Sequence, residues 1–535
     1  MITIREWRRV AALIALMLLI TTIPYALGAQ RGGFSGFVFG VEDGNSYLGK
    51  MRLGMRGELA FYLFYTPEIH DSAPLINLPY LVAGWIVGRF VSESSAESHS
   101  ALIGAFHAFR WIAGALLLIA IYRFIAMLIA DPAQRLAALL LAAFGGGVGW
   151  LLALIGAGDL FGSLPADLYI PEGFSFQVLF GLPHLALARA ALLMGFVMLI
   201  DRKSALAAGL CWLLVGVIVP FYLAVIYAVL SAWGLLRWLR ERRFPRDLAI
   251  TGGAAALIAA PALVYNAVVF ASSPAFGVWS AQNILPSPHP IHYLLAYGVI
   301  GALALIGAWA ARRDPRWTLP LAWIAIAPLL VYLPINVQRR LAEGVIVPLA
   351  ALAAVGLFHW LPRQGRLRAL IIGGLSLTSG FLWLGGLFTA LAARPPAFIA
   401  PAYAAAFIWL NDPAGGNARA DDVILAAVPT GNALPAYVRA RVYMGHGPET
   451  LFWRDKTRTV EAFFSGRLSD AERAALFDPP CPPPEGELCL LPVRYVIAGD
   501  QERAFGAEAA WSGGLTPIYD ADGVRIYAIN PEPPG

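Results

Sequence analysis

Long apolar stretches recur along the chain from about residue 10 to about residue 391, and short polar segments separate them. Most approach the roughly 20 residues that an α-helix needs to cross the hydrocarbon core of a membrane. The pattern predicts twelve such segments, at residues 10–28, 74–90, 101–129, 136–156, 176–200, 205–219, 221–238, 248–271, 291–311, 318–335, 341–360 and 369–392. The chain is therefore expected to be a polytopic α-helical membrane protein.

Arginines in the short segments between apolar stretches predict orientation, because such residues favour the cytoplasmic side. The clusters lie at residues 5–9, 237–246, 312–316 and 363–368. They place the N-terminus in the cytoplasm and the C-terminal part outside the cell membrane. Twelve crossings would return the C-terminus to the cytoplasm, so the arginines favour about eleven or thirteen. A helix break at Gly145–Gly147 or at Pro183 is where we expect an irregular segment.

The first apolar run follows a basic start and ends near small residues, as in a secretory signal peptide. We interpret it as a retained helix, and a cleaved segment is the alternative.

From about residue 399 polar residues return. Short β-type runs occur at residues 422–426, 494–498 and 524–528, and Ser469 is placed to cap a helix over residues 470–477. We predict a transmembrane domain over residues 1–398 and a small extracytoplasmic α/β domain over residues 399–535.

Composition agrees with this organisation. Of 535 residues, 59% are hydrophobic and 14% charged, and the mean hydropathy is +0.65; soluble domains carry about 25% charged residues. The net charge of +5 sits in clusters between apolar runs, so it indicates membrane orientation rather than a nucleic-acid partner. The chain lacks a Walker A motif, which leaves ATP-driven transport without a recognisable nucleotide site.

Two of the three cysteines flank a polar loop, CPPPEGELC. Cys481 and Cys489 could form a disulfide if this part faces an oxidising compartment, and two free thiols are the alternative.

The first external loop, residues 30–72, carries the adjacent carboxylates Glu42 and Asp43. Carboxylates bind Mg²⁺ or Mn²⁺, and one can instead accept a proton from an attacking hydroxyl. Lys50 and Arg52 follow and are candidate residues for binding a phosphorylated lipid. An ordinary solvated loop is the competing interpretation. Residues 47–55 and 59–65 have the mixed pattern of helices lying in the membrane interface.

A second basic cluster is Arg339-Arg340, at the predicted external end of a helix, where positive residues are disfavoured. Guanidinium groups match phosphate oxygens, so the pair is a candidate site for a lipid phosphate. Snorkelling to lipid headgroups is the alternative. In the C-terminal part, the run PTGNALPAYVRARVYMGHGPET combines His446 and Glu449 with glycines and could lean over the membrane site.

The chain resembles the GT-C superfamily of membrane glycosyltransferases, particularly bacterial glycosyltransferase-39-like or mannosyltransferase-like proteins. The resemblance rests on the acidic pair within VEDGNSYLGKM, the many helices, the QRRLAEG segment before a late helix, and the external α/β domain. It covers the layout of the whole chain. The WWDYG-type motif of oligosaccharyltransferases is lacking, so that subclass is not expected.

The resemblance implies transfer of a sugar from a polyprenyl-phosphate donor to an acceptor hydroxyl at the outer face, with inversion at the anomeric carbon. Asp43 would be the general base or a metal ligand and Glu42 its partner. Arg339 or Arg340 would stabilise the leaving lipid phosphate. His70 and Asp71 would position the acceptor. Asp43 and the arginine pair should then share one pocket, within about 15 Å of each other.

Two other functions are compatible with parts of this pattern. A flippase or other secondary transporter explains many helices and intramembrane ionisable residues, and it would place substrate contacts at mid-membrane depth on broken helices. A non-catalytic assembly protein would keep the fold without the chemistry. Neither accounts for the long acidic loop as directly as a glycosyltransferase does.

Overall fold

The computed structural model describes residues 2–481 and 488–529. It divides into two compact units, each built from separated stretches of chain. Unit 1 comprises residues 1–24, 109–267 and 284–388, and unit 2 comprises residues 25–108, 268–283 and 389–535. The predicted division at residue 398 remains a prediction, and compactness places the loop at residues 30–72 in the same unit as the C-terminal part.

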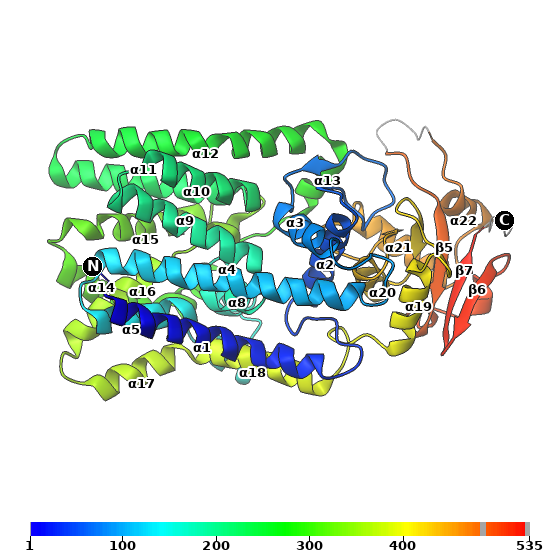
Figure 1. Ribbon diagram of the computed structural model, residues 1–535, viewed down its shortest axis with the longest axis horizontal. Helices are drawn as coiled ribbons and strands as arrows, with labels where there is room; N and C mark the ends of the chain where they lie inside the picture. The colour runs from blue at the N-terminus through cyan, green and yellow to red at the C-terminus, as the bar shows by residue number, and fades with distance from the viewer. Residues whose placement is uncertain (1, 482–487, 530–535) are drawn as a thin grey trace. The chain divides into compact units, whose positions relative to one another are not determined.

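Within the described ranges, eight helical segments are long and apolar enough to cross a membrane, or nine if the bent pair α17 and α18 counts as one span. The single helices are α1 (Ile4–Ala29), α4 (Ser98–Leu128), α9 (Pro183–Asp201), α11 (Tyr222–Glu241), α12 (Arg246–Ser272) and α14 (Pro290–Ala311). The composite spans are α5 with α6 (Pro132–Phe144, Gly149–Leu154) and η2 with α16 (Gln338–Ala342, Ile346–Trp360). The bent pair is α17 (Gly365–Leu375) and α18 (Leu377–Ala392), at 51°. The prediction of a polytopic helical membrane protein is confirmed (Figure 1).

Three predicted segments form shorter apolar helices: α3 (Leu78–Val87), α10 (Ala205–Ile218) and α15 (Thr318–Leu330). With ten residues, α3 is about 15 Å long, half the thickness of the hydrocarbon core. The prediction of a membrane-spanning helix at residues 74–90 is therefore wrong. One side of α3 is packed against other protein through Tyr80, Leu81, Gly84 and Val87, and Val82, Trp85 and Ile86 are exposed.

Both predicted helix breaks are present. Helix α5 ends at Phe144, and α6 begins at Gly149. The backbone N–H groups of Gly147 and Gly149 donate to Oδ2 of Asp167, at 2.9 and 3.1 Å, and Thr378 donates to the same oxygen at 2.8 Å. The freed N–H groups are thus satisfied by a buried carboxylate, as a helix break away from water requires. At the second site, α8 (Ser175–Gly181) ends and α9 begins around Leu182.

Unit 2 contains helix α2 (Val41–Met55), which packs closely on α3. The ideal Cβ position of Gly54 lies 1.9 Å from the carbonyl oxygen of Leu81, and that of Gly84 lies 1.7 Å from the carbonyl oxygen of Met51. Only glycine fits at these two crossings. Residues 47–55 are helical as expected, whereas residues 59–65 are not: β1 (Ala60–Phe61) pairs antiparallel with β2 (Ala73–Pro74). The aromatic residues within positions 59–65 favour an extended chain.

The C-terminal part of unit 2 is a five-stranded sheet in the order β4-β3-β5-β7-β6 (Figure 1). Strand β3 (Val423–Leu425) is parallel to β4 (Arg441–Val442) and β5 (Val493–Ala498), and β7 (Val524–Ala528) is antiparallel to β5 and β6 (Thr516–Ala521). The accompanying helices are α13 (Pro274–Gln282), α19 (Pro401–Asn411), α20 (Val428–Ala433), α21 (Trp453–Phe464), α22 (Asp470–Phe477) and α23 (Asp500–Arg503). The three predicted strands and the α22 helix with its Ser469 cap are confirmed. Of the two alternatives for Cys481 and Cys489, the structure has the disulfide.

Candidate functional site

The acidic pair lies at the N-terminus of α2. Gly40 precedes the helix with φ 58°, a left-handed conformation that suits glycine, and Glu42 and Asp43 occupy the first turn. Negative side chains are stabilised there by the helix dipole. Both are exposed, while most of the rest of α2 is buried. The helix thus presents two carboxylates at the exposed end of an otherwise packed element.

A C-terminal segment is hydrogen-bonded to both carboxylates. His446 Nε2 lies 3.2 Å from Asp43 Oδ1, and the backbone N–H of Gly447 donates to Glu42 Oε1 at 2.7 Å. His446 is 4% exposed, whereas the side chain of Asp43 is 58% exposed. Asn432 adds a bond to the Glu42 carbonyl at 3.2 Å. The run that the sequence singled out around His446 therefore contacts the acidic pair.

Charges beneath the pair are coupled. Burial lowers the pKa of His446, but the charge of Glu449 and the hydrogen bond to Asp43 outweigh it and raise the pKa above its usual value. Burial raises the pKa of Glu449, and the charges of Lys50 and His446 bring it below its ordinary range.

Lys50 and Glu449 form a buried ion pair, 2.6 Å apart, with side-chain exposures of 4% and 7%. Ser46 donates to the same oxygen of Glu449 at 3.0 Å. A second buried pair joins Lys456 to Glu68 at 2.7 Å, with Thr66 bonded to Lys456 at 2.6 Å. Burial lowers the pKa of Lys456 to about 8. These pairs tie α2 and the loop that follows it to the C-terminal part of the chain.

Arg52 lies inside the protein and donates to the carbonyl oxygens of Glu93 and Ala436 and to the Ser98 hydroxyl, at 3.1, 3.0 and 3.1 Å. Burial lowers its pKa to about 10. Lys50 and Arg52 thus both contact protein atoms in this structure, and their predicted role in binding substrate remains a prediction.

His70 and Asp71 lie beside strand β2. His70 Nε2 accepts from the backbone N–H of Leu63 at 3.0 Å, and Nδ1 lies 2.7 Å from the Glu68 carbonyl. Burial lowers the pKa of His70, so the ring is a neutral link between two backbone segments. Asp71 is exposed. Their predicted contact with an acceptor remains a prediction.

The arginine pair belongs to unit 1, in η2. Arg340 lies 3.6 Å from Glu172 and over the ring of Phe221, and Arg339 lies over the ring of Tyr169 at 5.0 Å. Among the described residues no carboxylate lies within ion-pair distance of Arg339. Its guanidinium is thus not paired with a carboxylate in the part of the chain that the structure describes. The predicted convergence of these arginines with Asp43 stays a prediction.

A buried ion pair holds the chain just after the two arginines. Glu343 forms a fully buried two-point ion pair with Arg189, at 2.6 and 2.9 Å. Arg189 also donates to the carbonyl of Glu172 at 2.7 Å. Arg189 thus holds two segments near Arg340: the chain at Glu343, three residues further on, and the backbone at Glu172, whose carboxylate lies 3.6 Å from Arg340.

Three members of the acidic site were not predicted from the sequence, namely Asn45, Ser46 and Tyr65, whereas Asn432 and Gly447 belong to the predicted run around His446. One signal was available for Ser46. Glu42, Ser46 and Lys50 recur at every fourth position, which places three polar side chains on one face of a helix. Asn45 lies in α2 and Tyr65 in the loop that follows it, whereas Asn432 and Gly447 come from a segment about 400 residues away.

Whether the site could hold a metal ion depends on which ligating side chains lie close together. Within residues 2–481 and 488–529, no group of three or more His, Cys, Asp and Glu side chains is arranged to hold a metal ion. The adjacent carboxylates Glu42 and Asp43 are a smaller set. Such a set suits Mg²⁺, which binds through one or two carboxylates, several waters and a substrate phosphate.

Comparison with known proteins supports a fold rather than a family. No family profile and no curated protein matches the sequence. Among solved structures, the oligosaccharyltransferase of Archaeoglobus fulgidus, tethered to an acceptor peptide, is similar with 13% identity and a TM-score of 0.51 over 97% of this chain and 74% of that chain. Its apo form matches with 14% identity and a TM-score of 0.50 over 92% and 69%.

ArnT from Cupriavidus metallidurans bound to undecaprenyl phosphate matches with 13% identity and a TM-score of 0.49, over 98% of both chains. The likeness to the oligosaccharyltransferase extends over almost the whole chain. The chain therefore shares the fold of this oligosaccharyltransferase.

Proposed function

We propose that this protein is a membrane glycosyltransferase that moves a sugar from a polyprenyl-phosphate-linked donor to an acceptor at the outer face of the cell membrane. The observation that carries the proposal is the exposed carboxylate pair Glu42-Asp43, hydrogen-bonded to His446 and Gly447, on a fold shared with an oligosaccharyltransferase. Fold alone does not assign a reaction. The reaction is therefore derived from the chemistry of these side chains.

Asp43 acts as the general base. Its carboxylate accepts the proton of the acceptor hydroxyl while the hydroxyl oxygen forms a bond to the anomeric carbon. The bond from that carbon to the phosphate oxygen breaks, and its electron pair leaves with the lipid phosphate. One displacement inverts the anomeric configuration. His446 holds Asp43 from the buried side, and the Gly447 N–H holds Glu42 in the same way.

Negative charge grows on the departing lipid phosphate, so the transition state needs a cation there. Arg339 and Arg340 supply it in this proposal, since Arg339 carries no carboxylate partner among the described residues. In this proposal His70 and Asp71 help to position the acceptor, and Lys50 and Arg52 help to bind the donor. If Asp43 instead serves as a metal ligand, Glu42 and Asp43 would hold Mg²⁺ or Mn²⁺, which would neutralise phosphate charge on the donor.

This chemistry sets an orientation. We place the N-terminus in the cytoplasm and the carboxylates, together with the C-terminal sheet, on the extracytoplasmic side, as the arginine clusters predict. The membrane lipids and the lipid-linked donor are then the immediate partners of the helices.

The test is transfer of radiolabelled sugar by the purified full chain from a panel of polyprenyl-phosphate sugars, with and without Mg²⁺ or Mn²⁺. Asp43→Asn is compared with Glu97→Gln, which removes another exposed carboxylate of unit 2. We expect transfer by wild type and by Glu97→Gln, and a loss of about 100-fold or more in Asp43→Asn. No transfer from any donor would contradict the proposal and favour a transporter or assembly protein.

A further inference from the structure

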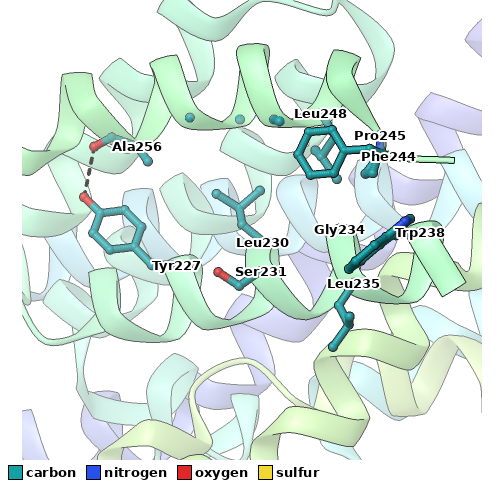
Figure 2. A pocket seen from close by; sticks show the side chains of 13 residues that line it. Tyr227, Leu230, Ser231, Gly234, Leu235, Trp238, Phe244, Pro245, Leu248 and Ala256 are labelled. Atoms are coloured by element: carbon teal, nitrogen blue, oxygen red, sulfur yellow. Dashed lines mark hydrogen bonds between the residues drawn. The ribbon is translucent and has the colours of Figure 1, made fainter.

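An apolar groove lies between α11 and α12 in unit 1, and none of its lining residues takes part in the proposed reaction (Figure 2). Its volume is about 410 Å³. Small residues on both helices keep it open, and a Cβ added at Gly253 would meet no atom within 4 Å. The lining residues are Tyr227, Leu230, Ser231, Gly234, Leu235, Trp238, Phe244, Pro245, Leu248, Ala249, Gly252, Gly253 and Ala256.

The groove has two defined ends. At one end the Tyr227 hydroxyl donates to the carbonyl of Ala256 at 3.0 Å and joins the two helices. At the other end stand Trp238 and Phe244, which are 51% and 62% exposed. Eleven helical steps separate Tyr227 from Trp238, a length of about 16 Å. That length matches one leaflet of a hydrocarbon core about 30 Å thick.

The open end meets a strongly basic segment. Residues 237–247 contain five arginines and two carboxylates. Arg237 pairs with both carboxylates, Glu241 and Asp247, at 3.2 and 3.0 Å. Arg240 donates to backbone carbonyls at residues 313 and 314. The segment therefore has more positive charge than its own acids neutralise.

Two of the remaining arginines are available to a ligand. Arg242 and Arg243 are exposed, and among the described residues neither has a carboxylate within ion-pair distance. They lie between the C-terminus of α11 and the N-terminus of α12 at Arg246. The dipole at that N-terminus also favours an anion. Aromatic side chains at this level are typical of a membrane interface.

We propose that this groove binds one anionic glycerophospholipid, with an acyl chain along α11 and α12 and the headgroup phosphate at Arg242 and Arg243. The apolar lining excludes a soluble anion as the whole ligand, and the arginines distinguish an anionic headgroup from a zwitterionic one. The site is separate from the sugar-transfer reaction, so its test does not depend on the proposed function.

The test is native mass spectrometry of the detergent-purified full chain with phosphatidylglycerol and phosphatidylcholine that carry the same acyl chains. We expect phosphatidylglycerol to bind about tenfold tighter. Arg242→Gln with Arg243→Gln should abolish this preference. Arg363→Gln with Arg366→Gln, which removes the same charge from another exposed basic segment, should keep it.

Filling the groove tests the acyl-chain contact. Gly253→Phe should reduce binding of both lipids, whereas Gly373→Phe, at a second exposed helical glycine with open space around it, should not. Equal affinity for the two lipids, an unchanged preference in the Arg242/Arg243 variant, or unchanged binding by Gly253→Phe would overturn the proposal. Competition by inorganic phosphate at millimolar concentration would also overturn it, since the ligand would then be a free anion.

Discussion

Asp43 and His446 have opposite exposures, and this contrast determines what each can do. The carboxylate reaches solvent, while the imidazole is buried and is 3.2 Å away. A buried partner held by packing fixes the orientation of an exposed side chain. His446 is therefore a positioning residue for Asp43 and does not itself touch substrate in this account.

We predict that His446→Ala lowers kcat for sugar transfer by about tenfold to 100-fold with little change in KM for the donor, because a misplaced base slows the chemical step. His446→Gln keeps an N–H donor and should lose less. Steady-state kinetics on the three proteins give the comparison. Equal losses in both variants, accompanied by a lower melting temperature, would instead indicate a structural role.

Lys50 is predicted to support the fold. Lys50→Met leaves the buried carboxylate of Glu449 without its ion-pair partner, and breaking comparable pairs costs about 3–5 kcal/mol. The double variant Lys50→Met with Glu449→Gln removes both charges and should recover much of the melting temperature in detergent. If the single variant melts with wild type, Lys50 does not stabilise the fold through this pair.

Individual residues of the site could be read from the sequence, but their contacts could not. Glu42 and Asp43 stood out as adjacent carboxylates in a loop, and His446 and Glu449 stood out among glycines. Asp43 and His446 are 403 positions apart. A single sequence has no local pattern that reports a pairing over such a distance.

At the scale of elements, the position of the acidic pair depends on how α2 packs on α3. The two helices approach until the backbone of each meets a glycine of the other. We predict that Gly84→Ala lowers stability by about 1–3 kcal/mol and reduces sugar transfer, because its methyl group would overlap the Met51 carbonyl.

Gly104→Ala in α4 is the matched control, since a Cβ there meets nothing within 4 Å. It should leave stability unchanged or raise it slightly, as alanine favours helix over glycine. Thermal unfolding of both variants tests the packing. Equal melting temperatures for Gly84→Ala and wild type would show that the close approach does not hold α2 in place.

Elements were predicted best where local chemistry decides them. The strand at residues 423–425 follows from β-branched residues, and α22 follows from its Ser469 cap with Glu472 in the first turn. Apolarity alone misled for α3, because burial in protein and burial in lipid select the same residues. Residues 59–65 were also misread, since their aromatic side chains suit either an interface helix or an extended chain.

At the scale of the whole molecule, the compact units do not follow the order of the chain, because each is built from separated stretches. Unit 2 gathers residues 25–108 with the C-terminal part, and unit 1 holds the arginine pair. The sequence predicted the parts but not this grouping, which arises from contacts such as Lys50 with Glu449. The proposed reaction requires Asp43 and Arg340 to serve one substrate.

We predict that cysteines at positions 43 and 340, in a Cys211→Ser background, are joined by a bifunctional reagent whose spacer spans about 15 Å, the reach of a sugar phosphate in a small-ligand pocket. Cysteines at positions 97 and 340 provide the comparison. Mobility of the cross-linked chain on a denaturing gel, after cleavage between the two positions, reports the yield. Absence of the 43–340 product with every spacer up to that length would remove the arginines from the site.

The most direct test of the central claim separates donor binding from chemistry in Asp43→Asn. Once a donor is identified, its binding is measured by equilibrium titration and its transfer by single-turnover kinetics, on wild type and variant side by side. If Asp43 is the general base, the dissociation constant stays within a few-fold of wild type while the transfer rate falls by about 100-fold or more. Transfer at the wild-type rate by Asp43→Asn would contradict the account.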